Sequence, residues 1–306
     1  MAKTRVIALI NMKGGVAKTT TTVGLAEALV ANEGKKVLII DLDPQTNATS
    51  ILMDAQSWEK VNDEGQTIYH LFKEATDKNY KKRFDINKAV IKDVGNITDM
   101  KGLDLLSSSV DLIYDQDEII QAYPVDRRYG SITYLEKIIS PIKKNYDYIL
   151  IDCPPSLNLI TQNGLAIADS YIIPTMPDEL STRGIPQLVR RIEQFSEQNN
   201  QTLKPLGIVI TKLRTVTNGL TQTIIGRLEN NKSRIRAISY PNEKDKVKEI
   251  SVGLFETRFK ELKGIAEAGQ YTPYSKTYQE KWGVNTGSNL PICEMFNQFA
   301  AEIIKR

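Results

Sequence analysis

The segment KGGVAKTT at residues 13–20 has the composition of a loop that binds the phosphates of a nucleotide. A short apolar run precedes it and a helical pattern follows it, so the loop is expected between a strand and a helix. Backbone N–H groups at the start of that helix would point at the phosphates, and Gly14 and Gly15 would let the backbone approach them without Cβ clashes. Lys18 would reach the β- and γ-phosphates, and the Thr19 hydroxyl would ligate Mg²⁺.

The match to the standard pattern GxxxxGK[ST] is incomplete, because Met12 and Ala17 stand where that pattern has glycine. What remains is KGG followed by KT, the deviant form of the Walker A motif, with Lys13 as a second lysine at the start of the loop. The alternative is an ordinary turn rich in lysine and glycine. The strand expected before it and the helix expected after it favour a phosphate loop.

Two further motifs place carboxylates where strands end. VLIIDLDPQTNAT, at 37–49, puts Asp41 and Asp43 at the carboxyl end of a buried strand. YDYILIDCPPS, at 146–156, puts Asp152 at the end of another. Ligands of open α/β sheets gather at this end of the strands, and a carboxylate beside a phosphate loop serves as a partner of the metal. By itself Asp152 would also fit a helix cap or a turn, but the phosphate loop upstream favours the metal role.

Short apolar runs alternate with amphipathic stretches along most of the chain. Several runs, such as VLII and YILI, are apolar on both faces, which is typical of strands in a parallel sheet covered by helices on both sides. The alternation predicts a doubly wound α/β fold with a mostly parallel sheet. The expected strands are Val6–Ile10, Val37–Asp41, Leu103–Ser107, Tyr148–Asp152, Tyr171–Thr175 and Leu206–Thr211. The expected helices are residues 19–32, 131–143, 181–197 and 217–229.

Two regions break this alternation. Residues 50–130 are polar and mixed, and we expect most of them to form helices and loops inserted at the edge of the sheet. Residues 230–250 form a charged excursion before a possible strand at Leu254–Phe259, and residues 288–306 have the pattern of a final amphipathic helix. Since no repeat, low-complexity tract or long flexible linker interrupts the chain, residues 1–306 are expected to form a single domain.

The composition argues against several other kinds of site. Of the 306 residues, 41% are hydrophobic and 25% are charged, which is ordinary for a soluble globular protein. The cysteines, Cys153 and Cys293, lie far apart and His70 is the single histidine, so no disulfide framework, zinc site or histidine-based triad is expected. The N-terminus is a poor signal peptide, and no apolar run approaches the roughly 20 residues that span a bilayer. We therefore expect a cytoplasmic protein.

With these motifs the chain resembles the ParA/MinD family of ATPases with a deviant Walker A motif. The matching segments are KGGVAKTT at 13–20, DLDPQTNAT at 41–49 and DYILIDCPPS at 147–156, with IIPTMPDELSTRGI at 172–185 as a looser match. Their spacing and order agree with the family over residues 4–215. The resemblance is strongest to the Soj-like ParA branch, which segregates plasmids and chromosomes. It implies a P-loop fold, ATP and Mg²⁺ as cofactors, and hydrolysis of ATP to ADP and phosphate.

The resemblance implies that Lys13, Lys18 and Asp43 are catalytic. Lys13 resembles the signature lysine that reaches across a dimer interface to the partner's ATP, and Lys18 resembles the lysine that binds phosphates within one subunit. Asp43 resembles the residue that positions the attacking water. Two lysines and Mg²⁺ would neutralise charge on the transferring phosphoryl group while the carboxylate orients the nucleophile. Because Lys13 would act on the partner's nucleotide, a homodimer is expected in the ATP state.

The resemblance also implies which residues hold the nucleotide and the metal. Thr19 would ligate Mg²⁺, and Asp41 and Asp152 would hold the ion mostly through water. Thr20 would bind the α-phosphate, and residues 211–212 are candidates for the adenine side. The expected nucleotide-binding residues are Lys13, Gly14, Gly15, Val16, Ala17, Lys18, Thr19, Thr20, Asp152, Thr211 and Lys212.

Binding of nonspecific DNA by the ATP dimer is a further property of this family. Soj-like chains carry a late segment resembling IPRNVRLSEAPS, whereas this chain has FETRFKELKGIAEA at 255–268 and lacks the Pro-Arg-Asn part. Residues 227–263 contain ten Lys or Arg and six Asp or Glu, a local net charge of +4 against +3 for the whole chain. A basic face there would bind DNA in a salt-sensitive, sequence-independent way, with Arg258, Lys260 and Lys263 as candidate contacts. The alternative is a solvated surface of mixed charge.

The expected partners follow from the same resemblance. A ParB-type centromere-binding protein would stimulate hydrolysis and release the dimer from the nucleoid. Asp178 and Glu179 would lie near the nucleotide or the dimer partner. Because the phosphate loop starts at residue 13, we expect no N-terminal helix-turn-helix domain for operator DNA.

Three other functions stay open. A MinD-like membrane-cycling ATPase would use a basic amphipathic C-terminal helix, but Lys305 and Arg306 are the only basic residues of ICEMFNQFAAEIIKR, so a helix packed on the sheet and no membrane contact are favoured. A carrier like the nitrogenase iron protein would need cysteines that hold a cluster, whereas Cys153 follows a strand directly and Cys293 lies in the final helix. A synthetase with a small phosphate acceptor is the third, since the sequence reveals no acceptor pocket.

Overall fold

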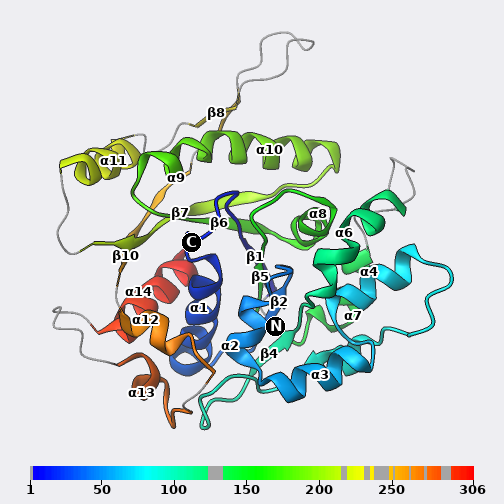
Figure 1. Ribbon diagram of the computed structural model, residues 1–306. Helices are drawn as coiled ribbons and strands as arrows, with labels where there is room; N and C mark the ends of the chain where they lie inside the picture. The colour runs from blue at the N-terminus through cyan, green and yellow to red at the C-terminus, as the bar shows by residue number, and fades with distance from the viewer. Residues whose placement is uncertain are drawn as a thin grey trace.

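The computed structural model describes residues 3–122, 134–214, 219–230, 235–237, 248–250, 252–261, 263–271, 274–283 and 291–306. The strands of its main sheet are β1 (Arg5–Leu9), β2 (Val37–Asp41), β3 (Val90–Ile91), β4 (Leu103–Leu106), β5 (Tyr148–Asp152), β6 (Ser170–Thr175), β7 (Lys204–Leu213) and β10 (Leu254–Lys260). Their order is β10-β7-β6-β1-β5-β2-β4-β3, and β3 alone is antiparallel to its neighbour. A mostly parallel sheet between helices (Figure 1) confirms the predicted fold class, and each predicted strand is present close to its expected bounds.

The core lies on both faces of the sheet because the inner strands are apolar on both sides. Val6 and Ala8 of β1 belong to the core cluster on one face. Ile7 and Leu9, which alternate with them, belong to the cluster on the other face. All four side chains are fully buried, as the two-residue period of a strand requires when helices cover both faces.

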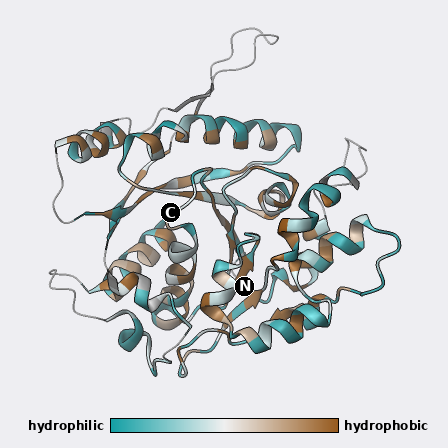
Figure 2. Cartoon of the chain, viewed as in Figure 1, coloured by the Kyte–Doolittle hydropathy of each residue, from teal (hydrophilic) through white to brown (hydrophobic). Residues whose placement is uncertain are grey.

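Helices form a layer on each side of the sheet (Figure 1). One core cluster includes residues of α1 (Lys18–Glu33), α2 (Asn47–Leu52), α13 (Tyr278–Trp282) and α14 (Ile292–Lys305). The other includes residues of α4 (Ile68–Thr76), α6 (Asp111–Ala122), α7 (Tyr134–Lys143), α8 (Leu159–Ile167) and α10 (Ile185–Gln198). The remaining helices are α3 (Ala55–Asp63), α5 (Ile86–Ala89), α9 (Glu179–Arg183), α11 (Gly219–Asn230) and α12 (Lys263–Ala268). Figure 2 shows hydrophobic residues along the central strands and mostly hydrophilic residues on the outer side of α10.

One predicted helix is divided in the structure. We predict a single helix at 181–197, whereas the chain forms α9 and then α10. Asp178 caps the start of α9, since its carboxylate accepts a hydrogen bond from the Ser181 N–H. Pro186 lies in the first turn of α10, where its missing N–H is tolerated, so the second helix begins there.

The two regions that break the alternation contain regular structure. Within residues 50–130 the chain forms α3 to α6 and the two strands, β4 and β3, at one edge of the sheet. Within residues 230–250, β8 (Ile235–Ala237) and β9 (Lys248–Ile250) pair antiparallel as a separate two-stranded sheet. That the whole chain is a single domain with these insertions stays a prediction.

The final helix packs against the helix that follows the phosphate loop. Phe296, Phe299 and Ile303 of α14 are at most 1% exposed and share a core cluster with α1. Gly24 of α1 permits the close approach, because a Cβ there would lie 2.2 Å from the Phe296 ring. The favoured interpretation of the C-terminal segment, a helix packed on the sheet, is confirmed, because Phe299 also contacts Phe255 of β10. In the part of the chain that the structure describes, no helix is long and apolar enough to cross a bilayer.

Candidate nucleotide site

The predicted phosphate loop connects β1, in the middle of the sheet, to α1. Gly15 (φ 75°) and Ala17 (φ 62°) are both in the left-handed region, which glycine adopts freely and alanine only under strain. A Cβ on Gly14 or Gly15 would meet no atom within 4 Å, so the space over the loop is open. No side chain caps the start of α1. The first N–H groups of this helix therefore face a site where an anion would be stabilised.

Lys18 is 6% exposed at the first position of α1. Its ammonium donates a hydrogen bond to the Lys13 carbonyl oxygen, at 3.4 Å. Burial lowers the pKa of Lys18, and the negative charges of Asp152 and Asp43 oppose this shift. A buried ammonium with one long hydrogen bond is poised to bind an anion such as a phosphate.

Asp152 ends β5 and connects it to the first turn of α1. Its carboxylate accepts hydrogen bonds from the hydroxyls of Thr19, at 2.7 Å, and Thr22, at 3.2 Å. The side chain is fully buried, and this burial raises the pKa of Asp152. The structure thus brings together two of the three side chains that the sequence assigns to Mg²⁺, a threonine hydroxyl and a strand-end carboxylate.

Asp41 lies opposite Asp152 in the register of β2 and β5, and it too is fully buried. Burial, with the nearby Asp152 as a second cause, raises the pKa of Asp41. One carboxylate oxygen accepts the Asp43 N–H at 3.1 Å, and the other accepts the N–H and hydroxyl of Thr49, at 2.9 and 2.7 Å. Asp41 therefore holds the backbone turn that carries Asp43.

Asp43 is 6% exposed and belongs to the same group of charges, since it acts on the pKa values of Lys18 and Asp152. One of its oxygens accepts the Gln45 N–H at 3.0 Å. Its backbone carbonyl accepts the Thr46 N–H at 2.9 Å. The turn thereby presents the Asp43 carboxylate toward the same end of the sheet as the phosphate loop.

The Lys13 side chain contacts the segment after β6. Its ammonium lies 3.2 and 3.4 Å from the two Asp178 carboxylate oxygens, and it donates a hydrogen bond to the Ser181 hydroxyl at 2.8 Å. The Lys13 N–H is held by the side chain of Asn11, whose own amide donates to the Pro174 carbonyl at 2.8 Å. Sequence reasoning missed Asn11 and Ser181, although a polar residue directly after a buried strand is a usable signal for Asn11.

The loop is also supported from β7. The Thr211 hydroxyl donates a hydrogen bond to the Val16 carbonyl at 3.0 Å, and Thr211 is 1% exposed. Lys212 follows in the left-handed region, with φ 50°, and is exposed. Thr211 thus anchors the backbone of the loop, and contact of either residue with adenine stays a prediction.

The Mg²⁺ and nucleotide roles fit this arrangement. Mg²⁺ usually takes one or two carboxylates, keeps several waters and binds phosphate oxygens, and Thr19 beside Asp152 offers such a partial set of ligands. The described residues hold no group of three or more His, Cys, Asp or Glu that would bind a metal by itself. The open glycine loop, the uncapped helix and the buried Lys18 supply what a phosphate chain requires.

The candidate DNA contacts lie elsewhere, around β10. Arg258 forms an ion pair with Glu229 of α11, and both side chains are partly exposed. Lys260 ends β10 beside Leu213. Lys263 opens α12, but its side chain lies outside the described residues. Their contact with DNA stays a prediction.

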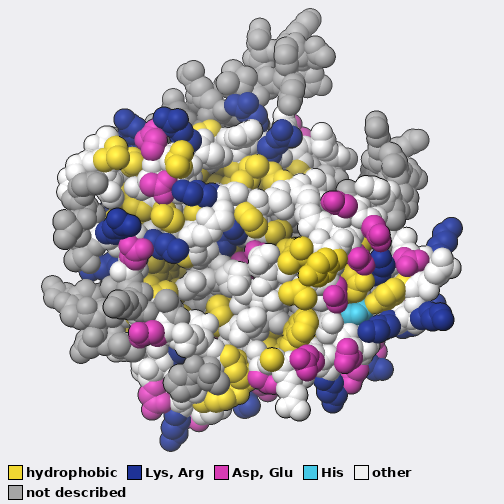
Figure 3. Space-filling model, viewed as in Figure 1, with side chains coloured by type: hydrophobic (Ala, Val, Ile, Leu, Met, Phe, Trp, Pro, Cys, Tyr) yellow, Lys and Arg dark blue, Asp and Glu magenta, His cyan; other side chains and the backbone are white. Residues whose placement is uncertain are grey.

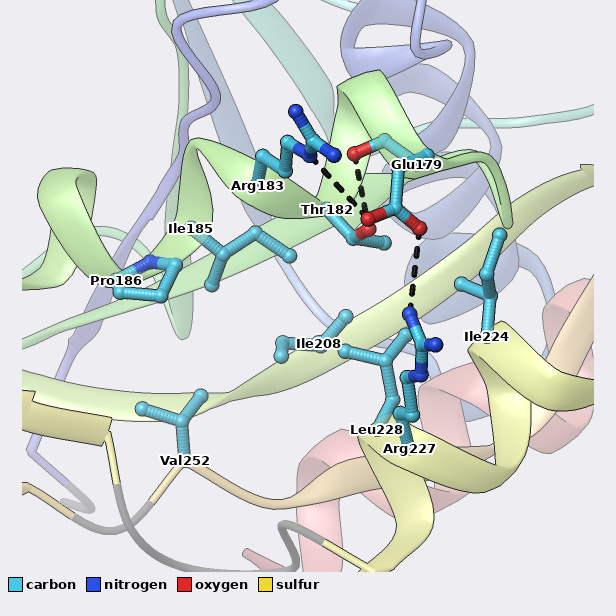
Figure 4. Close-up of a pocket in the computed structure, with 10 residues that line it drawn as sticks. All are labelled: Glu179, Thr182, Arg183, Ile185, Pro186, Ile208, Ile224, Arg227, Leu228 and Val252. Carbon is cyan, nitrogen blue, oxygen red and sulfur yellow. Dashed lines mark hydrogen bonds and ion pairs between the residues drawn. The ribbon is translucent and has the colours of Figure 1, made fainter.

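A cavity of about 170 Å³ lies between α9 and α11 (Figure 4). Glu179 accepts hydrogen bonds from Arg183 at 3.2 Å and from Arg227 at 3.4 Å at one side of it. None of the lining residues is one of the predicted nucleotide-binding residues. The complete lining is Glu179, Thr182, Arg183, Ile185, Pro186, Ile208, Ile224, Arg227, Leu228 and Val252.

Comparisons with known proteins identify relatives of this chain. Residues 4–205 match the family described as an AAA domain. The chain is 35% identical to the chromosome-partitioning ATPase Soj of Treponema pallidum over 225 residues, which cover 74% of this chain and 77% of that protein.

Two solved structures are also similar. A cobyrinic acid a,c-diamide synthase of Mycobacterium smegmatis, with an ATP analogue and magnesium bound, has a TM-score of 0.59 at 27% identity, over 80% of this chain and 86% of that one. A plasmid partition protein of Borrelia burgdorferi bound to AMPPNP has a TM-score of 0.62 at 22% identity and covers 99% of both chains, which shows a shared fold. Given the family match, the partition relative and the loop with its second lysine, this chain belongs to the ParA/MinD family of P-loop ATPases, in its partition branch.

Proposed function

We propose that this protein is a partition ATPase. Mg²⁺-ATP drives formation of a sandwich homodimer that binds nonspecific DNA on the nucleoid, and a ParB-type centromere-binding protein stimulates hydrolysis and so resets the cycle. The observation that carries the proposal is the convergence of Lys18, Thr19, Asp43 and Asp152 at the open phosphate loop, where the Lys13 ammonium contacts Asp178.

The chemistry of this arrangement is phosphoryl transfer to water. Lys18 and the N–H groups of the loop would bind the phosphate oxygens, and Lys13 of a second copy would add charge at the γ-phosphate. Mg²⁺, when bound, would neutralise charge that develops on the phosphates. Asp43, held by its turn, would orient the attacking water. Lys13 links hydrolysis to dimerisation because it would act on the partner's nucleotide.

Exposed apolar side chains support a dimer at this edge of the sheet. Met12 follows β1, Ile113 and Tyr114 follow β4, and Leu180 follows β6, and these four side chains are 43% to 80% exposed. Because the strands are parallel, their carboxyl ends meet at the edge that carries the phosphate loop. Figure 3 shows hydrophobic side chains gathered on the face that carries α6. Apolar surface of this kind is typical of an interface, and a second copy would cover it together with the nucleotides.

The proposal is tested by binding of fluorescently labelled random-sequence DNA, measured by anisotropy with ATP, with ADP and without nucleotide, each at low and high salt. We expect DNA binding in the presence of ATP but not with ADP or without nucleotide, and we expect it to be lost as salt rises, because contacts with DNA phosphates release counterions.

Two variants extend this test. Lys18→Ala should not bind DNA in any of the three nucleotide conditions, and Asp43→Ala should stay bound to DNA with ATP because it retains the nucleotide without hydrolysing it. Equal binding in all three nucleotide states would contradict the proposed switch.

The DNA surface is tested in the same assay with the double variant Lys260→Glu, Lys263→Glu. Reversal of two charges should weaken DNA binding by about tenfold or more at low salt while ATP affinity stays unchanged. Unchanged DNA affinity would place the DNA surface elsewhere on the dimer.

A second candidate function is a synthetase with a small-molecule acceptor, which the likeness to the M. smegmatis synthase supports. The two functions differ in what stimulates hydrolysis. DNA together with a ParB-type protein would accelerate a partition ATPase, whereas cobyrinic acid with an amide donor would accelerate a synthase. Phosphate release measured under both conditions separates them.

A further inference from the structure

Lys13 is held within its own chain by a contact built from α9. Its ammonium reaches both oxygens of Asp178 and the Ser181 hydroxyl, and the side chains of Lys13 and Asp178 are 35% and 37% exposed. Ser181 is almost fully buried, so this part of the contact does not move freely. The lysine thus has three acceptor atoms in one place within its own subunit.

Asp178 organises this contact as well as the start of α9. One of its oxygens accepts the Ser181 N–H at 2.8 Å, and the other accepts the Ser181 hydroxyl at 2.5 Å. Burial opposes ionisation, but the hydrogen bonds from Ser181 and the Lys13 ammonium outweigh it and lower the pKa of Asp178. The carboxylate is therefore charged at neutral pH and oriented toward Lys13.

These contacts exclude the proposed role of Lys13 while they last. An ammonium that donates to Asp178 and Ser181 cannot at the same time reach a nucleotide in a second copy. We propose that Asp178 is a positioning residue that holds Lys13 in its own subunit and thereby sets the protein concentration at which the ATP dimer forms. The inference rests on the proposed function, because it presumes an ATP-dependent dimer.

The size of the effect follows from the exposure of the ion pair. An ion pair that is exposed to this extent changes the equilibrium constant of a reaction that breaks it by about twofold to fivefold. A symmetric dimer releases two lysines, so the dimer dissociation constant should carry this factor twice, roughly fourfold to twenty-fivefold. The contact would raise the protein concentration needed for dimerisation without preventing it.

The variant Asp178→Asn removes the charge but keeps the helix cap. Asparagine is as good a cap as aspartate, and Asn158 already caps α8 of this chain by accepting the Thr161 N–H at 3.1 Å. With a non-hydrolysable ATP analogue, sedimentation velocity over a dilution series gives the dimer dissociation constant. We expect Asp178→Asn to lower this constant by about fourfold or more, with the ATP affinity of the monomer unchanged and the melting temperature lowered by no more than a few degrees, because the lost ion pair also stabilises the folded monomer slightly.

Asp54→Asn is the matched control. Asp54 caps α3 by accepting the Ser57 N–H at 2.9 Å, which is the same local arrangement, but no ion pair of Asp54 occurs among the described residues. Asp54→Asn changes the net charge by the same amount as Asp178→Asn but leaves the contact of Lys13 intact. Its dimer dissociation constant should therefore equal that of the wild type. Ser181→Ala, which removes one acceptor of Lys13, should act in the same direction as Asp178→Asn and more weakly.

The outcomes separate the inference from the proposed function. If the wild type forms no dimer with the analogue, the proposed function fails. If the wild type dimerises and Asp178→Asn dimerises equally or less tightly, the positioning role of Asp178 is wrong while the proposed function stands. A tighter dimer in Asp54→Asn as well would assign the effect to net charge and overturn the inference.

Discussion

At the scale of single residues, the site contains two buried carboxylates on neighbouring strands. Asp41 and Asp152 face each other in register, and burial raises the pKa of both. Hydroxyl and N–H groups satisfy their oxygens, but Lys18, the cation whose charge acts on Asp152, is itself buried. Such a pair costs stability in the nucleotide-free protein, and a bound Mg²⁺ would offset that cost.

This pair sets the direction of the pH dependence. Because the folded pKa values are higher than the value of about 4 in the unfolded chain, the folded protein binds more protons between about pH 4 and the raised values. The free energy of unfolding of the nucleotide-free protein therefore falls as pH rises through that window. Asp152→Asn removes the contribution of Asp152 while an amide oxygen still accepts from Thr19.

We expect Asp152→Asn to raise the free energy of unfolding by about 1 kcal/mol or more at pH 8 and by less at pH 6, since deprotonation of Asp152 no longer destabilises the fold. Urea unfolding at the two pH values measures this, and the variant should lose Mg²⁺-dependent hydrolysis. If the variant is less stable than the wild type at both pH values, the buried Asp152 carboxylate does not destabilise the fold and the prediction is wrong.

The residues of the site differ in how far the sequence predicts them. Lys18 and Thr19 belong to a loop motif, and Asp152 ends an apolar strand, so motif spacing and strand polarity are enough to predict that they meet. Asn11 and Ser181 are single polar residues without a spacing signature. Their hydrogen bonds to the loop and to Lys13 depend on how β6 lies beside β1, which no local pattern reveals.

At the scale of elements, α1 carries the phosphate loop at its start and the C-terminal elements along its length. Glu27, in the middle of α1, is fully buried and accepts hydrogen bonds from Lys281 and Trp282 of α13. Gly24, one turn earlier, receives the ring of Phe296. The sequence predicts α1 and α14 but neither α13 nor its contact with α1, because 254 residues separate Glu27 from Lys281.

Gly24→Ala tests this packing. The added Cβ would lie 2.2 Å from the ring of Phe296, which is fixed in the core, so α14 must shift. We expect a loss of about 1–3 kcal/mol in the free energy of unfolding by urea. Gly226→Ala in α11 is the control, because its Cβ would meet no atom within 4 Å, and there the better helix propensity of alanine should stabilise by about 0.5–1 kcal/mol. Equal effects at the two positions would contradict the close packing of α1 and α14.

At the scale of the whole molecule, the order of strands assembles one edge from distant parts of the sequence. β1 lies between β5 and β6, so the loop meets Asp152 on one side and the segment of Asp178 on the other. β7 adds Thr211, whose hydroxyl bonds Val16 across 195 residues. The alternation of strands and helices predicts the sheet, but the place of each strand within it comes from tertiary packing.

Because this edge forms in the folded state alone, Mg²⁺-ATP should stabilise the whole protein. At a hundred times the dissociation constant the gain is about 2.7 kcal/mol, which should raise the melting temperature by several degrees. Lys18→Ala should show no increase, and EDTA should reduce it for the wild type. Thermal denaturation followed by circular dichroism measures both, and an equal shift in Lys18→Ala would contradict the role of that lysine.

The positions of the two tryptophans have an optical consequence. The Trp282 indole donates its hydrogen bond to Glu27 of α1, and the Trp58 indole donates to the Ser108 carbonyl at 3.0 Å. The Ser108 N–H in turn donates to the hydroxyl of Thr49, which bonds the Asp41 carboxylate. These are the only tryptophans in the sequence. Tryptophan fluorescence of the unlabelled protein therefore has two sources, one hydrogen-bonded to the helix that follows the phosphate loop and one connected to the turn that carries Asp43. Replacing either indole by phenylalanine leaves a single reporter for the other.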